Sequence, residues 1–303
     1  MKLQAIAVAL WFGLVSTTAS ALAFDVTYDA SVASAPSSFK TAFQDAINFY
    51  QNTFSNPITI NIIVGWGKIN GHALKANALG ASSHSNVLEN YSTVSALLNK
   101  INPTYVLPAT SQIKGNIGVS FAEAGALGIN VGNGLDGSVG FGSSASWNYT
   151  PNTAAPGEYN LFSVAEHEIS EVMGRTSLLN TTCTGNYCAQ QSVLDLYRYT
   201  APGVLATTGG KAYFSTNGGV TNINTFNGNA GKGDLGDWAR LTSDAFNYAS
   251  SPGYNPPFSA GDITLMKALG YTLTSPVPEP ETYRLLLCGL GMMGFMARRR
   301  KNI

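Results

Sequence analysis

Three ionisable residues in the segment 161–175 have the types and the spacing of a metal site. His167 is one of three histidines in the chain, and Glu168 and Glu171 follow it by one and four positions. In an α-helix His167 and Glu171 fall on one face, and Glu168 lies beside them. Zinc binds imidazole nitrogen and carboxylate oxygen, so His167 and Glu171 are candidate ligands. Glu168 is then placed to transfer a proton.

The remaining residues of this segment predict how such a helix packs against the rest of the protein. The opposite face carries the apolar residues Phe162, Ala165, Ile169 and Val172. An apolar stripe of this kind packs into a core and leaves the polar stripe facing a cleft. The alternative interpretation is a solvated acidic helix face that binds no metal, because Glu166 adds a fourth ionisable residue to the cluster.

The sequence HEISE at 167–171 resembles the zinc-protease motif H-E-x-x-H, with Glu171 in place of the second histidine. The longer segment 165–175, AEHEISEVMGR, is similar to the metalloproteases that carry PEP-CTERM tails, and its glycine resembles that of the metzincin pattern. The resemblance implies an α+β, zincin-like metalloprotease fold with a mixed sheet and an active-site helix. It also implies that His167 and Glu171 bind Zn²⁺ and that Glu168 is the general base that activates water. Because a second carboxylate lowers the charge of the site, Mn²⁺ and Ca²⁺ are alternative metals.

The third metal ligand has to come from outside this helix. Ser177 occupies the position that the metzincin spacing assigns to histidine. Leishmanolysin-like enzymes take a third histidine from a distant segment, often just before a tryptophan, and Asp237-Trp238 resembles that segment with an aspartate. The resemblance therefore implies Asp237 as the third ligand, with Asp195 as the alternative.

The first 23 residues have the pattern of a signal peptide. Lys2 precedes an apolar run at 5–15, and Ala21-Leu22-Ala23 supplies the small residues that a signal peptidase recognises. Cleavage is predicted before Phe24, which makes 24–276 the mature domain. This range is long enough for one hydrophobic core, and neither an internal repeat nor a long linker divides it.

The C-terminal residues 277–303 resemble a PEP-CTERM sorting tail. Pro278, Glu279 and Pro280 precede an apolar run at 285–297, and a basic cluster follows at 298–301. The resemblance implies export from a Gram-negative cell, C-terminal processing by an exosortase, and a location at the cell surface or in the extracellular matrix. The apolar run predicts a short transmembrane helix that contacts the membrane transiently, since it is short for a permanent span. An ordinary anchor helix is the alternative.

Charge and cysteine usage limit the partners and the compartment. The chain has no formal net charge and only 11% charged residues, which argues against nucleic acid as a partner. Cys183 and Cys188 are spaced to close a small disulfide loop in an oxidising compartment. A metal pair is the alternative, but the third cysteine, Cys288, lies in the predicted tail and cannot complete a thiolate site.

Periodicity predicts the elements that position the site. Strands are expected at 24–28, 57–64 and 138–141, and helices at 39–54 after a cap at 36–38, at 92–101 and after Ser259. The segment 193–198 is predicted to be extended, and His72 and His84 are expected in surface loops. We expect the strand at 138–141 to lie at a sheet edge, where it binds the substrate backbone by strand addition.

Together these features predict an exported, zinc-dependent endopeptidase. It would hydrolyse peptide bonds of a protein or peptide substrate with a metal-activated water. The alternative is a catalytically silent surface or matrix protein that retains the protease fold. Glu171 and the missing third histidine motivate that alternative, and pairing of Glu171 with an arginine would favour it.

Overall fold

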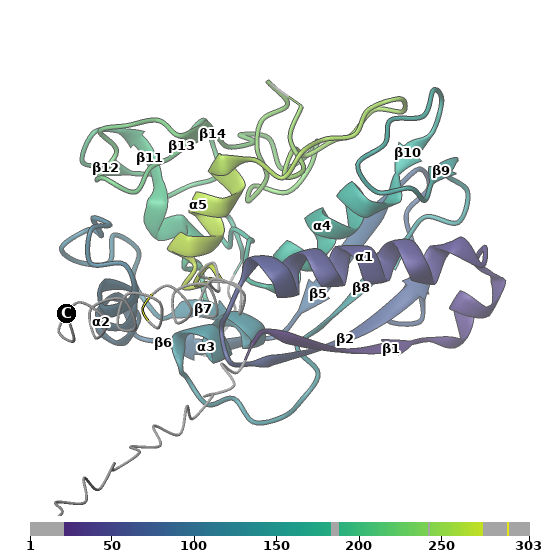
Figure 1. Ribbon diagram of the computed structural model, residues 1–303. Helices are drawn as coiled ribbons and strands as arrows, with labels where there is room; N and C mark the ends of the chain where they lie inside the picture. Colours follow the sequence, from purple (N-terminus) through teal and green to yellow (C-terminus); the bar gives the residue numbers. More distant parts are fainter. Residues whose placement is uncertain (1–20, 183–187, 242, 275–289, 291–303) are drawn as a thin grey trace, which may run out of the picture. The chain divides into compact units, whose positions relative to one another are not determined.

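A mixed four-stranded sheet forms the base of the candidate site in the computed structural model (Figure 1). Its strands follow the spatial order β1 (Ala23–Tyr28), β2 (Thr59–Trp66), β8 (Gly137–Phe141) and β5 (Gly80–His84). The first three strands are parallel, and β5 runs antiparallel to β8. The predicted α+β class with a mixed sheet is confirmed.

The place of β8 in this sheet differs from the prediction. The strand exists, but it lies between β2 and β5 and all five of its residues are buried, so the edge strands are β1 and β5. Its glycines explain the difference. A Cβ added to Gly137 would lie 2.6 Å from the Ser83 oxygen, and one added to Gly140 would lie 2.4 Å from the Lys68 oxygen. The absence of side chains at these glycines allows neighbouring backbone to approach the strand closely, so they do not indicate an exposed edge.

Two helices cover this sheet and lie alongside each other (Figure 1). They are α1 (Ser38–Thr53) and α4 (Leu161–Val172). The predicted inward face of α1 is confirmed, because its periodic apolar residues Phe39, Phe43, Ala46 and Tyr50 are buried. The Tyr50 hydroxyl donates a hydrogen bond of 2.5 Å to the Glu166 carbonyl, which ties the two helices together.

The remaining elements complete the described fold. The 3₁₀ helices are η1 (Ala30–Ser34) and η2 (Leu194–Tyr197), and the other helices are α2 (Tyr91–Ile101), α3 (Phe121–Leu127) and α5 (Ala260–Ala268). Short pairs are β3 (Lys68–Ile69) with β4 (His72–Ala73), β6 (Asn86–Glu89) with β7 (Ile117–Ser120), and β9 (Trp147–Asn148) with β10 (Tyr159–Asn160). A second sheet has the order β12 (Val204–Leu205), β11 (Arg198–Ala201), β13 (Tyr213–Phe214) and β14 (Asn224–Thr225).

The segment 193–198 was expected to be extended, and this prediction is wrong. Most of it forms η2, and only Arg198 enters a strand. The Asp195 carboxylate accepts a hydrogen bond of 2.9 Å from the Ser192 amide, which closes a local turn. Side-chain bonds of this kind compete with extended structure. By contrast, the helix predicted after Ser259 is confirmed as α5, with a capping box between Ser259 and Asp262.

The structure describes residues 21–182, 188–241, 243–274 and 290. A unit that ends at Thr272 contains all the elements above, and a second unit begins at Leu273. Residues 1–20 of the predicted signal peptide, which spans 1–23, and the sorting residues Pro278, Glu279 and Pro280 lie outside the described residues. The last residue of that predicted peptide, Ala23, begins β1. Within the described ranges, no helix has both the length and the apolar character needed to cross a membrane.

A buried acid in α3 gives a first testable prediction. Glu123 is 1% exposed, and burial raises its pKa well above the usual range. The folded state therefore favours the neutral acid, and the free energy of unfolding should fall as pH rises from about 4.5 toward the folded pKa. Glu123→Gln should remove this loss and raise the free energy of unfolding at pH 8.

Chemical denaturation at pH 5 and pH 8 measures this effect. The control is Asp25→Asn, which makes the same kind of acid-to-amide change at an exposed position of β1. Equal destabilisation by Glu123→Gln at both pH values would contradict a neutral Glu123.

Candidate metal centre

The helix that carries the cluster, α4, is enclosed on nearly all sides. Asn160 caps it by accepting a hydrogen bond of 3.0 Å from the Ser163 amide, and every helical residue except His167 is buried. The predicted apolar stripe is confirmed. The solvated acidic face is excluded, because Glu168 is 6% exposed and Glu171 is 3% exposed. The ionisable groups of this helix therefore lie in protein surroundings, where their charges must be compensated.

Three of the predicted residues converge at one point. His167 Nε2 lies 3.3 Å from Glu171 Oε1 and 3.3 Å from Asp237 Oδ1. All three atoms lie within 4.8 Å of one another. In a tetrahedral zinc site with bonds near 2.05 Å, neighbouring ligand atoms are separated by about 3.3–3.4 Å. The donor types and two of the three spacings therefore fit a zinc ion, although metal binding by these residues stays a prediction.

Trp238 explains why Asp237 reaches the helix. Its side chain is fully buried, and Trp238 Nε1 donates a hydrogen bond of 2.7 Å to Asp262 Oδ1 at the start of α5. The backbone on either side is also fixed, since the Trp238 amide bonds to the Phe246 carbonyl and the Asn227 amide to the Asp237 carbonyl. The tryptophan anchors the loop, and the preceding aspartate points at His167.

The orientation of His167 leaves one ring nitrogen available. Its Nδ1 lies 2.9 Å from the Ala245 carbonyl oxygen, which can only accept a hydrogen bond. In the neutral ring the proton is then on Nδ1, and Nε2 presents its lone pair to the carboxylates. Burial and Arg175 lower the pKa of His167, but Asp237 and Glu171 outweigh them and raise it well above the usual range. A metal must therefore displace a proton, and its affinity should fall in acid.

Glu171 is held as an anion by its neighbours. Its Oε2 accepts a hydrogen bond of 2.6 Å from the Ser82 hydroxyl on β5, which leaves Oε1 facing His167. Burial alone would raise its pKa, but the hydrogen bond and charge of His167, together with Arg175 and Ser82, lower the pKa to about 2. The carboxylate is thus ionised at any pH at which the protein is expected to work.

Arg175 is the member of the cluster that sequence analysis missed. Its Nη1 lies 2.6 Å from Asp237 Oδ1, and its Nη2 lies 3.3 Å from Glu171 Oε1. Gly174 makes this contact possible, because its φ of +103° turns the chain back after the helix. The i,i+4 spacing from Glu171 was the available signal, but it did not show that the arginine would turn inward.

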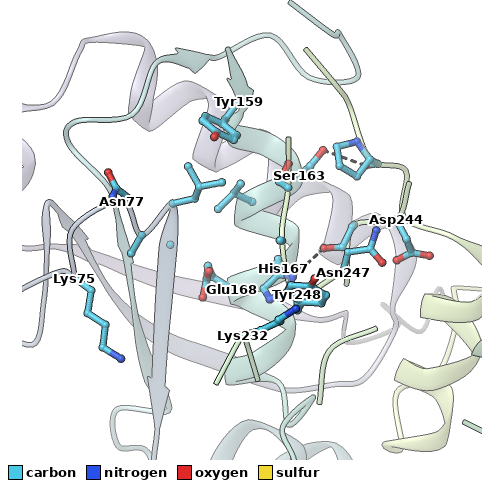
Figure 2. Close-up of a pocket in the computed structure, with 18 of the residues that line it drawn as sticks. Lys75, Asn77, Tyr159, Ser163, His167, Glu168, Lys232, Asp244, Asn247 and Tyr248 are labelled. Atoms are coloured by element: carbon cyan, nitrogen blue, oxygen red, sulfur yellow. Dashed lines mark hydrogen bonds between the residues drawn. The ribbon is translucent and has the colours of Figure 1, made fainter. Parts of the chain in front are cut away.

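Glu168 lies beside the ligand group and not in it. Together with His167 it lines a cavity of about 450 Å³, and both residues face this cavity in Figure 2. The carboxylate packs on the edge strand, since a Cβ added to Gly80 would lie 2.3 Å from Glu168 Oε1. Burial, followed by the charge of Glu171, raises the pKa of Glu168 well above the usual range. Glu168 thus holds its proton more tightly than a solvated carboxylate does.

Asp195, the alternative third ligand, lies outside the group formed by His167, Glu171 and Asp237. Its carboxylate accepts hydrogen bonds of 2.6 Å from the Ser177 hydroxyl and 3.0 Å from the Leu178 amide, in addition to the Ser192 amide. These bonds fix the turn after α4, so the described structure gives Asp195 a structural role.

Two other predictions concern residues near the site. His84 was expected in a surface loop, but it lies in β5 with Nε2 3.1 Å from Thr176 Oγ1, because the polar stretch around it forms the edge strand. His72 is exposed but belongs to the short strand β4. Cys188 takes part in a disulfide, and its predicted partner Cys183 lies outside the described residues.

Comparison with known proteins identifies the C-terminal end of the chain. A family model described as the PEP-CTERM protein-sorting motif matches residues 276–301. No curated protein and no solved structure matches the chain. The match confirms the predicted sorting tail, which is processed by an exosortase. The chain is therefore an exported protein that its C-terminal motif directs to the cell envelope of a Gram-negative bacterium.

Proposed function

We propose that this exported protein is a metal-dependent endopeptidase with a zincin-like fold. The observation that carries the proposal is the convergence of His167 Nε2, Glu171 Oε1 and Asp237 Oδ1 beside a cavity that also holds Glu168. One histidine and two carboxylates form a donor set that zinc accepts, and Mn²⁺ or Ca²⁺ would also suit its oxygen atoms. A cavity that is open to solvent beside the donor set provides room for a substrate.

The residues of the chain would divide the work as follows. A bound zinc ion supplies a Lewis acid that polarises a carbonyl and makes water acidic near neutral pH. His167, Glu171 and Asp237 would hold it. Glu168 would accept a proton from the attacking water and deliver it to the leaving amine. Burial raises the pKa of Glu168 above the usual range of a carboxyl group, which is the direction that general acid–base catalysis near neutral pH requires.

The sheet edge suggests how a peptide would bind. β5 is the edge strand of this sheet that lies next to the site, and cavities of about 450 Å³ and 400 Å³ both include residues of this strand. The first contains His167 and Glu168, and the second contains Glu171. An extended peptide that pairs with β5 would have its backbone beside the candidate ligands. Strand addition is therefore proposed at β5, in place of the strand at 138–141.

Metal analysis of the purified protein tests this function directly. We expect one zinc ion per chain after equilibration with zinc, chelator-sensitive cleavage of an unfolded protein substrate, and loss of both in His167→Ala. A wild-type protein that takes up no stoichiometric zinc, manganese or calcium would rule out the proposal.

A substitution in β5 tests the placement of Glu168. Gly80→Ala puts a methyl group where Glu168 Oε1 now lies, at 2.3 Å, so the carboxylate has to move. Because displacement of a catalytic group by about 1 Å can cost about 100-fold in rate, we expect kcat to fall by roughly that factor. The control is Gly134→Ala, whose added Cβ has no neighbour within 4 Å. Equal kcat values for the two variants would contradict this placement.

The second candidate is a catalytically silent envelope protein that retains the fold. Arg175 favours it, because its guanidinium contacts both Glu171 and Asp237 and compensates their charges without a metal. In this case His167→Ala and Glu168→Gln would change no hydrolytic activity, since the wild type would have none. Chelator-sensitive proteolysis by the wild type would exclude this candidate.

A further inference from the structure

Arg175 is built into the candidate metal centre more tightly than a surface counter-charge. Its side chain is fully buried, and its guanidinium lies 4.3 Å over the ring of Phe246. Its Nε donates a hydrogen bond of 2.6 Å to the Ser170 hydroxyl, and Nη2 lies 3.3 Å from the His167 carbonyl oxygen. A guanidinium held on several sides has a fixed position, and its charge is little screened by solvent.

Arg175 contacts the same two oxygen atoms that face His167. Those atoms are Glu171 Oε1 and Asp237 Oδ1. Each oxygen has more than one lone-pair direction, so it can accept from the guanidinium and still bind a metal. Arg175 thus contacts both candidate ligands from outside the ligand group, so its charge and the charge of a bound metal would act on the same two carboxylates.

The formal charge of the site gives Arg175 a second consequence. A divalent metal with one neutral histidine and two carboxylates has a formal charge of zero. A centre with two histidines and one glutamate has a charge of plus one. Adding the guanidinium of Arg175 to the present site also gives plus one. The arginine therefore returns the positive charge that the second carboxylate removes.

We propose that Arg175 is a positioning residue that is the counter-cation of Glu171 and Asp237 before the metal binds, and that it then offsets the extra carboxylate in the loaded site. This inference rests on the proposed function. It explains how the contacts of Arg175 with Glu171 and Asp237 are compatible with metal binding. In the metal-free protein Arg175 is the counter-cation of this pair, and in the loaded protein Arg175 and the metal compensate the two carboxylates together.

The inference makes a specific prediction about stability with and without zinc. Arg175→Met leaves two buried carboxylates without their main cation, so the metal-free full-length protein should melt roughly 6–20 °C below wild type. Zinc can supply the missing charge. Saturating zinc should therefore raise the melting midpoint of Arg175→Met by at least roughly twice as much as that of wild type. Arg175→Lys keeps the charge and should lie between them.

Arg198→Met provides a matched control. Arg198 is also fully buried and lies 4.5 Å over the ring of Phe226, but its Nη2 donates to the carbonyls of Gly210 and Asn227 instead of to carboxylates. Loss of Arg198 should lower the melting midpoint. The rise in melting midpoint on adding zinc should be no larger in Arg198→Met than in wild type. This control separates a buried arginine that supports the fold from one that serves the metal centre.

The test uses wild type, Arg175→Met, Arg175→Lys and Arg198→Met. Calorimetry measures the binding of zinc, and thermal unfolding measures the melting midpoint with and without zinc. A larger zinc-induced shift in Arg175→Met than in wild type and Arg198→Met supports the inference. Equal shifts in the three proteins would overturn it while leaving the proposed function intact. Failure of wild type to bind zinc would overturn the metal site itself, and calorimetry of wild type alone reports that outcome.

Discussion

Glu168→Gln is expected to give a protein that binds zinc but hydrolyses peptide bonds about 100–10,000-fold more slowly than wild type. Glutamine has nearly the same shape as glutamate, so the packing of this side chain against Gly80 should be kept. It cannot accept the proton of the attacking water. Because Glu168 lies outside the group formed by His167, Glu171 and Asp237, zinc affinity should change only a few-fold.

Glu166→Gln is the matched control for this experiment. Glu166 lies on the same helix and is also buried, but it does not line the cavity that contains His167 and Glu168. Burial raises its pKa as well, so its neutral substitute should be tolerated. The two variants should therefore be equally stable and differ in kcat. Undiminished cleavage by Glu168→Gln would show that the proposed base is not used.

Local periodicity was sufficient to predict the helices that carry the site. The apolar spacing in α1 and α4 reports which face is buried, and the structure confirms both faces. The spacing of His167 and Glu171 likewise follows from helix geometry alone. These features depend on neighbours within a few turns of the same helix, and a single sequence contains that information.

Features that depend on distant segments were predicted less well. Asp237 was predicted from the resemblance of Asp237-Trp238 to a distant ligand segment. The periodicity of the sequence did not point to it. The edge strand next to the site was predicted at 138–141 instead of at β5. Glycines are unusual in a buried strand, yet β8 contains them and is buried, and the polar stretch that suggested a loop forms β5. The polar residues Ser82 and Glu171 bond to each other across elements, so neither needs solvent.

The inward position of Arg175 also depends on distant segments, in this case through their charges. A charged residue directly after a helix usually lies in solvent. Here the guanidinium turns inward because Gly174 redirects the chain and two buried carboxylates compensate its charge. One of those carboxylates, Asp237, comes from a loop that only the folded structure brings to α4. The sequence contains each partner, but their meeting follows from the tertiary packing.

Asp237→Asn is expected to have the largest combined effect on the site. It removes a candidate ligand, so zinc affinity should fall by more than about 100-fold, since changes to outer-shell partners alone cost about 10–100-fold. It also leaves Arg175 without the carboxylate that lies 2.6 Å from its Nη1. Breaking a buried ion pair by removing one partner costs about 3–5 kcal/mol, and we expect the free energy of unfolding to fall by about 3 kcal/mol.

Asp234→Asn, in the same loop, should behave in the opposite way. The charge of Glu171 is the largest cause that raises the pKa of Asp234 to about 6. The stability that its proton provides is therefore present below about pH 4 and is lost as pH rises through 6. Neutralising it should increase stability at pH 8, have less effect at pH 5, and leave zinc affinity within a few-fold of wild type. If Asp234→Asn and Asp237→Asn instead lowered stability and zinc affinity equally, the loss would reflect disruption of the loop, and Asp237 would have no special claim to the metal.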